Sequence, residues 1–501
     1  MKRKNILIIS LCFILLIIGI GYSAFSSKLN INSSSSITSN WDVEITSIEQ
    51  TNNSGNIVEK NKSFTKDTAT FNVEMEKPGN YVYYKIGVTN KGSIPAIATL
   101  GSLTCSNDSF LCNAYADSNV STDIKTNTNL TNSRLIIDSN ETEYYNVYIK
   151  FKNEITEMPE NLINKLTLNL IYKQSDVGIT HKDNCYTGKV LKNGTLSITD
   201  YDETCGTDVV IPENIDGYTV TEIASGSYKD NVGSIGSFNN KKITSVTMPD
   251  TIVKVGAMSF MSNKITTLKL SNNLESIEFE AFQWNKIKTI NLPATLKYIG
   301  DSAFSSNRIT NIIIPSGVTN LGGGAFAGNN VTGKDAFIYG RNNDGSTDYT
   351  TLNSYAGKDN LETVIPQNVT TIMYRAFRNT NIKEIDIPSN VQRLDSYAFN
   401  GCYLTKVTLH EGLKFIGGGA FYASSLTEIN IPNSVESIGA KAFILNKLKT
   451  VTIGTGVKTI GADAFKTEQD YNPIETITIN QKEGSITGSP WGSNATIKWL
   501  G

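Results

Sequence analysis

The side chains best suited to acid–base or metal chemistry are scarce in this chain. It has two histidines, His181 and His410, in 501 residues. Zinc sites combine His and Cys ligands at short spacing, yet none of the six cysteines stands in a Cys-x-x-Cys motif. The Gly-x-Ser-x-Gly, His-Glu-x-x-His, P-loop and dinucleotide fingerprints are absent from the sequence too. We therefore expect no enzymatic activity, no bound metal and no cofactor.

Four cysteines suggest covalent cross-links instead. Cys105 and Cys112 are close enough in sequence to close a loop, and Cys185 and Cys205 could close another. Both pairs are disulfide candidates if the chain is exported, because oxidising compartments preserve such bonds. Free thiols are the alternative, and the sequence does not decide between the two.

The overall charge excludes some partners. The net charge is −2, and charged residues make up 18% of the chain, below the ~25% of ordinary soluble domains. This balance gives no electrostatic reason to expect a nucleic acid or an anionic membrane surface as the partner. The hydrophobic content of 39% is enough to build a core.

The N-terminus has the pattern of a targeting segment. Positive residues Lys2, Arg3 and Lys4 precede an apolar run at Ile6–Ile20. We interpret residues 1–26 as a signal peptide or a retained N-terminal anchor, with the rest of the chain outside the cytoplasmic membrane. Membrane contact would then be confined to residues 6–25, if the leader is retained. Residues 27–40 are rich in Ser and Asn and indicate an exposed spacer.

Residues 41–173 alternate polar and apolar side chains in short runs. Phe71, Val73 and Met75 are one example, and turn residues such as Pro78 and Gly79 separate the runs. This pattern predicts an antiparallel β-sandwich. Residues 174–184 are polar and form the expected linker to the next domain.

The stretch from Pro78 to Gly92, Pro-Gly-Asn-Tyr-Val-Tyr-Tyr-Lys-Ile-Gly-Val-Thr-Asn-Lys-Gly, resembles bacterial surface Ig-like modules. Together with the leader residues Gly21–Ser26, it is also similar to the camelysin/TasA group of exported proteins. The resemblance implies an exported β-sandwich.

The second half of the chain repeats one sequence motif, which is clearest at Ile429–Phe443. Its closing phenylalanine recurs every 22 residues (282 − 260, 465 − 443). A fixed period of this size predicts a solenoid, here of about ten coils, with the phenylalanines as core anchors. These anchors are Phe260, Phe282, Phe304, Phe326, Phe377, Phe399, Phe421, Phe443 and Phe465.

Each unit has two halves. The first is a short strand that proline often ends, and the second reads Val-x-x-Ile-Gly-x-x-Ala-Phe, as in Val435 to Phe443. We expect the glycine to form a tight turn. An asparagine three residues after the phenylalanine, such as Asn446, can bond the backbone of a neighbouring coil. Cys402 takes this position in one unit, where we expect a small buried residue.

These repeats resemble the BspA-like leucine-rich repeats, whose units read Ile-Pro-x-x-Val-x-x-Ile-Gly-x-x-Ala-Phe. The resemblance covers about residues 205–480 and recurs in register some nine times. It implies a mainly β fold, a right-handed β-rich solenoid on a bacterial surface, and a role in adhesion.

The solenoid divides into a few expected parts. Residues 185–240 form an N-terminal cap with a first degenerate repeat, in which Tyr228 takes the place of the phenylalanine. The repeats run over 241–480, with an inserted β-hairpin at about 337–360 whose turn lies near Asp344-Gly345. Residues 481–501 form a C-terminal cap.

The candidate binding face is the outward position at the centre of each first strand. An alternative is that threonine is common there only because it suits strands. The row reads Thr247, Lys269, Asn291, Ile313, Asp386, Thr408, Asn430, Thr452 and Thr478.

Extended solenoid faces commonly bind macromolecules. We therefore expect a non-enzymatic surface or secreted protein that binds an unknown protein or polysaccharide through this row. The alternative is a matrix or fibre component that assembles through the β-sandwich.

Overall fold

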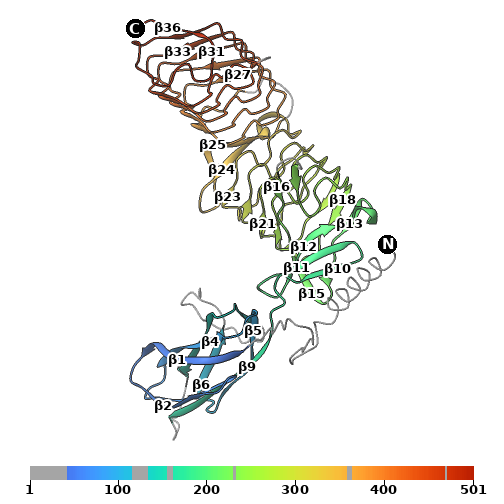
Figure 1. The fold of residues 1–501 in the computed structure, drawn as a ribbon, viewed down its shortest axis with the longest axis vertical. Helices are drawn as coiled ribbons and strands as arrows, with labels where there is room; N and C mark the ends of the chain where they lie inside the picture. The colour runs from blue at the N-terminus through green and yellow to red at the C-terminus, as the bar shows by residue number, and fades with distance from the viewer. Residues whose placement is uncertain (1–41, 116–133, 155–161, 230–232, 358–363, 469–470) are drawn as a thin grey trace, which may run out of the picture. The chain divides into compact units, whose positions relative to one another are not determined.

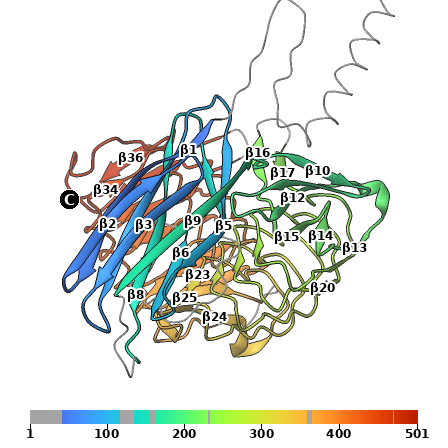
Figure 2. The same ribbon diagram turned by 90° about the horizontal axis from the view of Figure 1, so that it is seen from below.

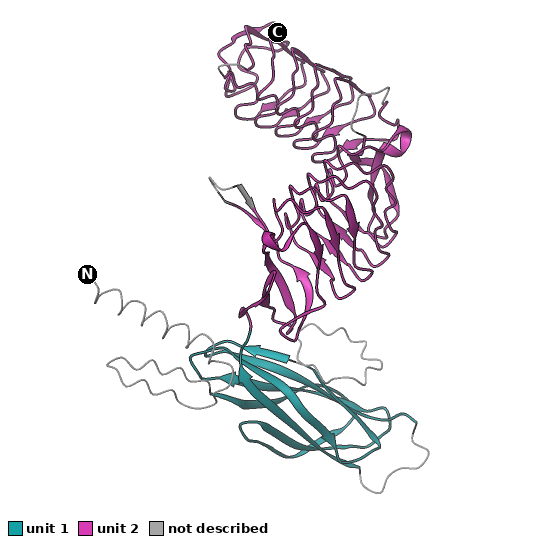
Figure 3. Ribbon diagram, turned by 90° about the vertical axis from the view of Figure 1, so that its right-hand side faces the viewer, with its two compact units in different colours: residues 1–176 teal, residues 177–501 magenta. Residues whose placement is uncertain are grey.

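A computed structural model describes residues 42–115, 134–154, 162–229, 233–357, 364–468 and 471–501. The expected leader (1–26) and spacer (27–40) lie outside these residues. The chain forms two compact units, residues 1–176 and 177–501 (Figure 3). Among the described residues, no helix is long and apolar enough to cross a membrane.

Unit 1 is an antiparallel β-sandwich, as the alternating pattern predicts (Figures 1 and 2). One sheet has the order β1 (Val43–Ser54), β4 (Tyr81–Asn90), β8 (Thr142–Phe151) and β6 (Phe110–Tyr115). The other has the order β2 (Ile57–Phe64), β3 (Thr68–Met75), β9 (Ile163–Gln174), β5 (Ala96–Cys105) and β7 (Arg134–Ile137). Strand alternation buries one side of each sheet, including Phe71, Tyr84, Tyr145 and Phe151.

Unit 2 begins with an antiparallel meander, β10 (Thr180–Asp183), β11 (Tyr186–Val190) and β12 (Leu196–Tyr201). Strand β12 then pairs in parallel with β15 (Tyr218–Ile223), and this change marks the start of the solenoid. The meander covers the edge that the first coil would otherwise expose, as a cap should. Short elements complete this part: the 3₁₀ helix η1 (Glu203–Cys205), β14 (Asn214–Ile215), β16 (Ser227–Lys229) and β17 (Gly233–Ile235).

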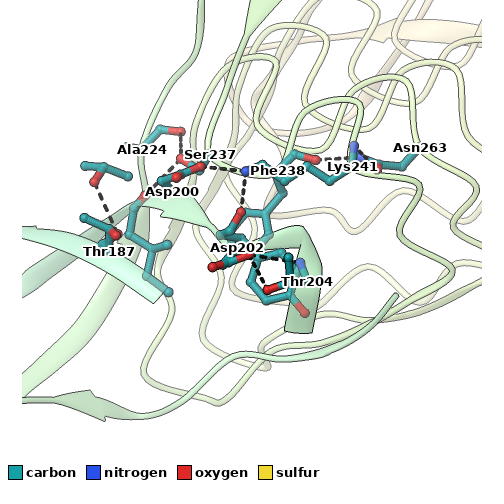
Figure 4. Close-up of polar contacts among 12 residues, drawn as sticks. Thr187, Asp200, Asp202, Thr204, Ala224, Ser237, Phe238, Lys241 and Asn263 are labelled. Atoms are coloured by element: carbon teal, nitrogen blue, oxygen red, sulfur yellow. Dashed lines mark hydrogen bonds and ion pairs between the residues drawn. The ribbon is translucent and has the colours of Figure 1, made fainter. Parts of the chain in front are cut away.

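Polar contacts attach the cap to the first coils (Figure 4). The Ser237 hydroxyl contacts the carbonyl oxygens of Ile198 at 3.0 Å and Ala224 at 3.1 Å. The Lys241 ammonium lies 2.6 Å from a carboxylate oxygen of Asp200. The Lys241 backbone N–H donates to Asn263 on the next coil. The cap is therefore continuous with the hydrogen bonding of the repeats.

The repeats stack as parallel coils that follow one another from green to red in Figure 1. Most coils contribute one strand to each of two sets of parallel strands, which we call the first and the second ladder. The first ladder contains β13 (Asp208–Val210), β18 (Ser245–Thr247), β20 (Thr267–Lys269), β27 (Glu384–Ile387), β29 (Lys406–Leu409), β31 (Glu428–Ile431), β33 (Thr450–Ile453), β35 (Thr476–Ile479) and β36 (Thr496–Trp499). The second contains β15, β19 (Lys254–Val255), β21 (Ser276–Ile277), β22 (Tyr298–Ile299), β23 (Asn320–Leu321), β26 (Thr371–Ile372), β28 (Arg393–Leu394), β30 (Phe415–Ile416), β32 (Ser437–Ile438) and β34 (Thr459–Ile460).

A column of aromatic rings runs through the core. All nine repeat phenylalanines are fully buried, and neighbours such as Phe421 and Phe443 stack with ring centroids 5.3 Å apart. The column also contains Phe238, which stacks on Phe260 at 4.6 Å, and Tyr355, which stacks on Phe377 at 5.3 Å. The expected solenoid is confirmed, with about 13 turns where the sequence predicted approximately ten. The additional turns lie where the sequence departs from the Ala-Phe pattern.

The place of Tyr228 was predicted wrongly. It lies on the β16–β17 hairpin with 72% of its surface exposed, whereas Phe238 takes the core position one period before Phe260. The hairpin interrupts the coil between its second strand and its core aromatic residue. Sequence spacing from Val220 and Ile223 therefore selected the wrong aromatic side chain.

Buried asparagines join each coil to the one before it. Asn446 Nδ2 donates to the carbonyl oxygens of Phe421 at 2.7 Å and Phe443 at 3.0 Å, while its Oδ1 accepts from the Leu426 N–H. The same pattern holds at Asn263, Asn285, Asn307 and Asn329. Cys402 takes the asparagine position as expected, with Sγ 2.9 Å from the Phe377 oxygen, and burial raises the pKa of its thiol to about 12.

The recurring glycine of the second half has a different cause from the one expected. Gly439 and its equivalents do not have positive φ. A Cβ at Gly439 would lie 2.3 Å from the Gly418 nitrogen of the preceding coil. Close approach of neighbouring backbones, rather than a left-handed turn, therefore favours glycine here.

The inserted segment is a β-hairpin whose second strand also forms part of a solenoid coil. A short 3₁₀ helix η2 (Gly333–Ala336) leads to β24 (Phe337–Arg341), which pairs antiparallel with β25 (Thr347–Tyr355). The end of β25 then pairs in parallel with β26 and places Tyr355 in the ring column. Each ladder is interrupted at this point, so the repeats form two blocks within one continuous core.

Candidate binding face of the solenoid

The predicted row of outward residues is brought together by the first ladder. Thr247 is the register partner of Lys269, Asp386 of Thr408, and Asn430 of Thr452. Paired strands in such a ladder lie ~4.8 Å apart, so these side chains form short registered stripes, one on β18 and β20, one on β27 and β29, and one on β31, β33, β35 and β36. The stripe is a direct result of coil stacking and does not depend on which residues occupy it.

Strand alternation exposes the row and buries its neighbours. In β31, Glu428 and Asn430 are exposed while Ile429 and Ile431 are buried in the core. The buried pair fixes the strand, because a register shift of one residue would place isoleucines in water. Exposed positions can therefore vary in chemistry without cost to the core.

Two members of the row lie outside the assigned strands. Asn291 and Ile313 are exposed, and Ile313 has 75% of its surface accessible, but neither residue belongs to a strand in the described chain. The insertion follows Ile313 and separates it from Asp386. The row is thus divided by the inserted hairpin, and its strand pairing stops again between Thr408 on β29 and Asn430 on β31.

The structure adds residues that the sequence prediction left out. Lys498 on β36 continues the row beyond Thr478. A second outward row lies two residues earlier on each strand. Its members are Ser245, Thr267, Glu384, Lys406, Glu428, Thr450, Thr476 and Thr496. The period of two in strands was the signal that could have identified this second row.

The chemistry of the face changes along the solenoid. At the start of the second block it carries both signs of charge, from Glu384, Asp386, Lys406 and Glu428. A ring nitrogen of His410 lies 2.6 Å from an Asp386 carboxylate oxygen. Toward the C-terminal end, the face becomes a grid of threonine hydroxyls: Thr450, Thr452, Thr476, Thr478 and Thr496. The face therefore offers charges of both signs at one end of the block and mainly hydroxyl groups at the other, where Lys498 is the charged residue of the row.

The other predicted site residues lie away from this face. Cys105 is joined to Cys112 between the two sheets of unit 1, and Cys185 is joined to Cys205 beside the cap. Both sulfurs of the first pair lie within 3.5 Å of Asn164 Nδ2. Among the described residues, no group of three His, Cys, Asp or Glu side chains could hold a metal ion.

Parallel coils with two short ladders and a buried residue column define a leucine-rich repeat solenoid. The family model "BspA type Leucine rich repeat region" matches residues 218–333 and 351–472, in six copies. The repeat region of this chain is therefore similar to BspA type leucine-rich repeats over these residues.

Several solved structures are similar to the chain. Pneumococcal vaccine antigen PcpA is 21% identical over 65% of this chain and 94% of that one, with a TM-score of 0.42. A leucine-rich repeat protein from Bacteroides ovatus is 19% identical over 64% and 76%, with a TM-score of 0.36. A leucine rich cell surface protein from Faecalibacterium prausnitzii is 18% identical over 62% and 97%, with a TM-score of 0.35. The comparison with curated proteins gave no match.

Proposed function

We propose that this chain is a bacterial surface protein that binds a protein or a polysaccharide through the first ladder of its solenoid. The observation that carries the proposal is the registered stripe of exposed side chains on a buried isoleucine and valine framework. The BspA type of the repeats supports a surface role. Adhesion to cells or to a matrix is the activity such a stripe would provide.

The physical argument is preorganisation. On β27, β31, β33 and β35 the outward residues are held by strands whose inward neighbours are buried, so little backbone freedom is lost when a partner binds. Hydroxyl, amide and charged groups recur at a fixed spacing along the stripe, which suits a partner that is itself extended. Affinity would then come from many small contacts rather than from one pocket.

The test uses the full chain with four changes in the row: Lys269→Ala, Asn291→Ala, Asp386→Ala and Asn430→Ala. A matched control changes four outward residues of the second ladder: Lys254→Ala, Asn320→Ala, Thr371→Ala and Thr459→Ala. Glycan and protein arrays identify the ligand of the parent chain, and the variants are then compared on that ligand. The row variant should lose binding and the control should keep it; equal binding by both would exclude this face.

A further inference from the structure

The outer face of one sheet in unit 1 has an unusual composition. Strand alternation turns Val82 and Tyr84 of β4 into the sandwich core and turns Tyr81 and Tyr83 outward. The outer face of an antiparallel sheet is normally polar. On β8 and β6 it also carries tyrosines, namely Tyr144, Tyr148 and Tyr115.

Three of these rings form one cluster. Tyr83 and Tyr148 are register partners on β4 and β8, with ring centroids 4.8 Å apart. Tyr81 lies 5.6 Å from Tyr83 and 6.2 Å from Tyr148. The cluster is therefore continuous across two strands, and burial among these rings raises the pKa of Tyr148 to about 12. Tyr81 and Tyr83 remain partly exposed.

Lysines flank the cluster. Lys150 is the register partner of Tyr81, and the Lys85 ammonium lies 4.8 Å from the centre of the Tyr144 ring. These two are the charged residues on the outward positions of β4, β6 and β8. Neither forms an ion pair with the described residues. Glu49, which faces Lys85 across the sheet, is on the edge strand β1.

We propose that this tyrosine face of β4, β8 and β6 binds an acidic polysaccharide. Sugar rings present C–H groups that pack on aromatic faces, and every ring in the cluster also carries a hydroxyl for hydrogen bonding. The two lysines provide charge complementarity for carboxylates along the glycan. A peptide that docks through its apolar side chains would favour aliphatic residues, whereas Leu111 is the one aliphatic side chain on the outward positions of β4, β6 and β8, and the rings there carry hydroxyl groups.

The face lies in unit 1 and is independent of the solenoid stripe. If it binds glycan, the sandwich is a binding module and the chain has two separate binding surfaces. Two linked surfaces raise avidity toward a polymer without any new contact.

The experiment measures retention of the full chain by polygalacturonate in affinity electrophoresis, with uncharged methyl-esterified polymer as the reference. The Lys85→Gln/Lys150→Gln and Tyr83→Ala variants should each bind roughly tenfold more weakly, and Tyr83→Phe should retain binding because the ring remains. Lys60→Gln/Lys165→Gln on the opposite sheet is the matched control and should bind as the parent does.

Four outcomes would overturn the proposal. The first two are binding equal to that of the parent by the lysine variant or by Tyr83→Ala. The third is that added poly-glutamate displaces the chain from polygalacturonate as well as free polygalacturonate does. The fourth is that the parent is not retained by polygalacturonate and the variants instead lose self-association of the chain. The lysine variant changes exposed or partly exposed side chains, so it remains informative even if Tyr83→Ala does not fold. The four-residue row variant of the solenoid should still bind polygalacturonate, which separates this proposal from the preceding one.

Discussion

A carboxylate oxygen of Glu280 lies 2.9 Å from a guanidinium nitrogen of Arg378, although the two residues are 98 positions apart. Arg375 contacts the same oxygen. The coil of Tyr355 allows this approach. In other coils the residues Gly-x-x-Ala form a turn between the second strand and the phenylalanine, whereas here strand β25 runs directly to the core ring of Tyr355. Gly323 and Gly324 of the preceding coil therefore pack directly on the backbone of Tyr374 and Arg375.

This ion triad predicts a large effect of Glu280→Ala. The side chains of Glu280 and Arg378 are 9% and 13% exposed, so removing the carboxylate leaves Arg378 without its ion-pair partner in a largely buried site beside the charge of Arg375. Arg375 itself would keep the nearby charge of Asp301. We expect a loss of ~3–5 kcal/mol in the free energy of unfolding, measured by urea denaturation. Glu275→Ala breaks an exposed pair with Lys297 in the same region and should cost less than ~1 kcal/mol. Equal costs for both variants would contradict the assignment.

The asparagine column predicts a second cost. Asn446→Ala would leave the Phe421 carbonyl and the Leu426 N–H without their buried partner, while the Phe443 carbonyl would keep its bond from Asn472, and we expect a loss of ~2–4 kcal/mol in the free energy of unfolding. Asn446→Ser should cost less, because Ser424 already contacts the Phe399 oxygen from the equivalent position. Amide hydrogen exchange would show the opening at these coils. Unchanged protection in Asn446→Ala would count against the interlocking role.

The ring column predicts that Phe443→Ala destabilises the solenoid by ~3–5 kcal/mol. Phe443 is fully buried between Phe421 and Phe465, and each neighbour would lose a stacked face. Phe415→Ala is the natural control, since that ring is 39% exposed on β30. Thermal unfolding compares the two. A melt of the Phe443 variant that matches the parent would refute its place in the core.

The Cys185–Cys205 cross-link should stabilise the cap. Its sequence separation is 20 residues, for which loop-closure entropy predicts ~3 kcal/mol. Cys185→Ser/Cys205→Ser should therefore unfold earlier than the parent, and a reductant should lower the melting temperature of unit 2 in the parent but not in this variant. The variant keeps only the Cys105–Cys112 bond of unit 1 as a target for the reductant. Thiol titration of the denatured, unreduced chain supplies the check. If every cysteine reacts, the free-thiol alternative is correct and the entropy argument does not apply.

Local repetition made most of the fold predictable from sequence. The period of 22 residues located the nine phenylalanines, because identical coils must repeat identical core residues. Prediction failed where a coil departs from the motif, as Tyr228 and Phe238 show, since an inserted hairpin changes the spacing without changing the core. Tyr355 was missed for the same reason.

The contacts between distant residues were not predictable in this way. Glu280 and Arg378 belong to different repeats and no sequence motif links them. Their approach is explained by the coil of Tyr355, which lacks the turn that other coils have before the core ring. The candidate face was predictable as a row, since outward positions follow from strand alternation. The inserted hairpin that divides it was predicted as well, but the break in strand pairing between β29 and β31 was not, because the sequence spacing there is the ordinary 22 residues. The tyrosine face depends on the register of β4 with β8, which the sequence does not specify.

The central claim is that the outward row of the first ladder binds the ligand, while the repeated sequence motif only builds the solenoid scaffold. Surface plasmon resonance of the full chain on its array-identified ligand tests it most directly, with Asn430→Ala/Thr452→Ala compared to Ser437→Ala/Thr459→Ala on the same coils. All four residues are outward members of neighbouring strands, so stability should be equal in the two variants. We predict a clear loss of affinity for the first pair and parental affinity for the second. Parental affinity for both pairs, or an equal loss in both, would contradict the account.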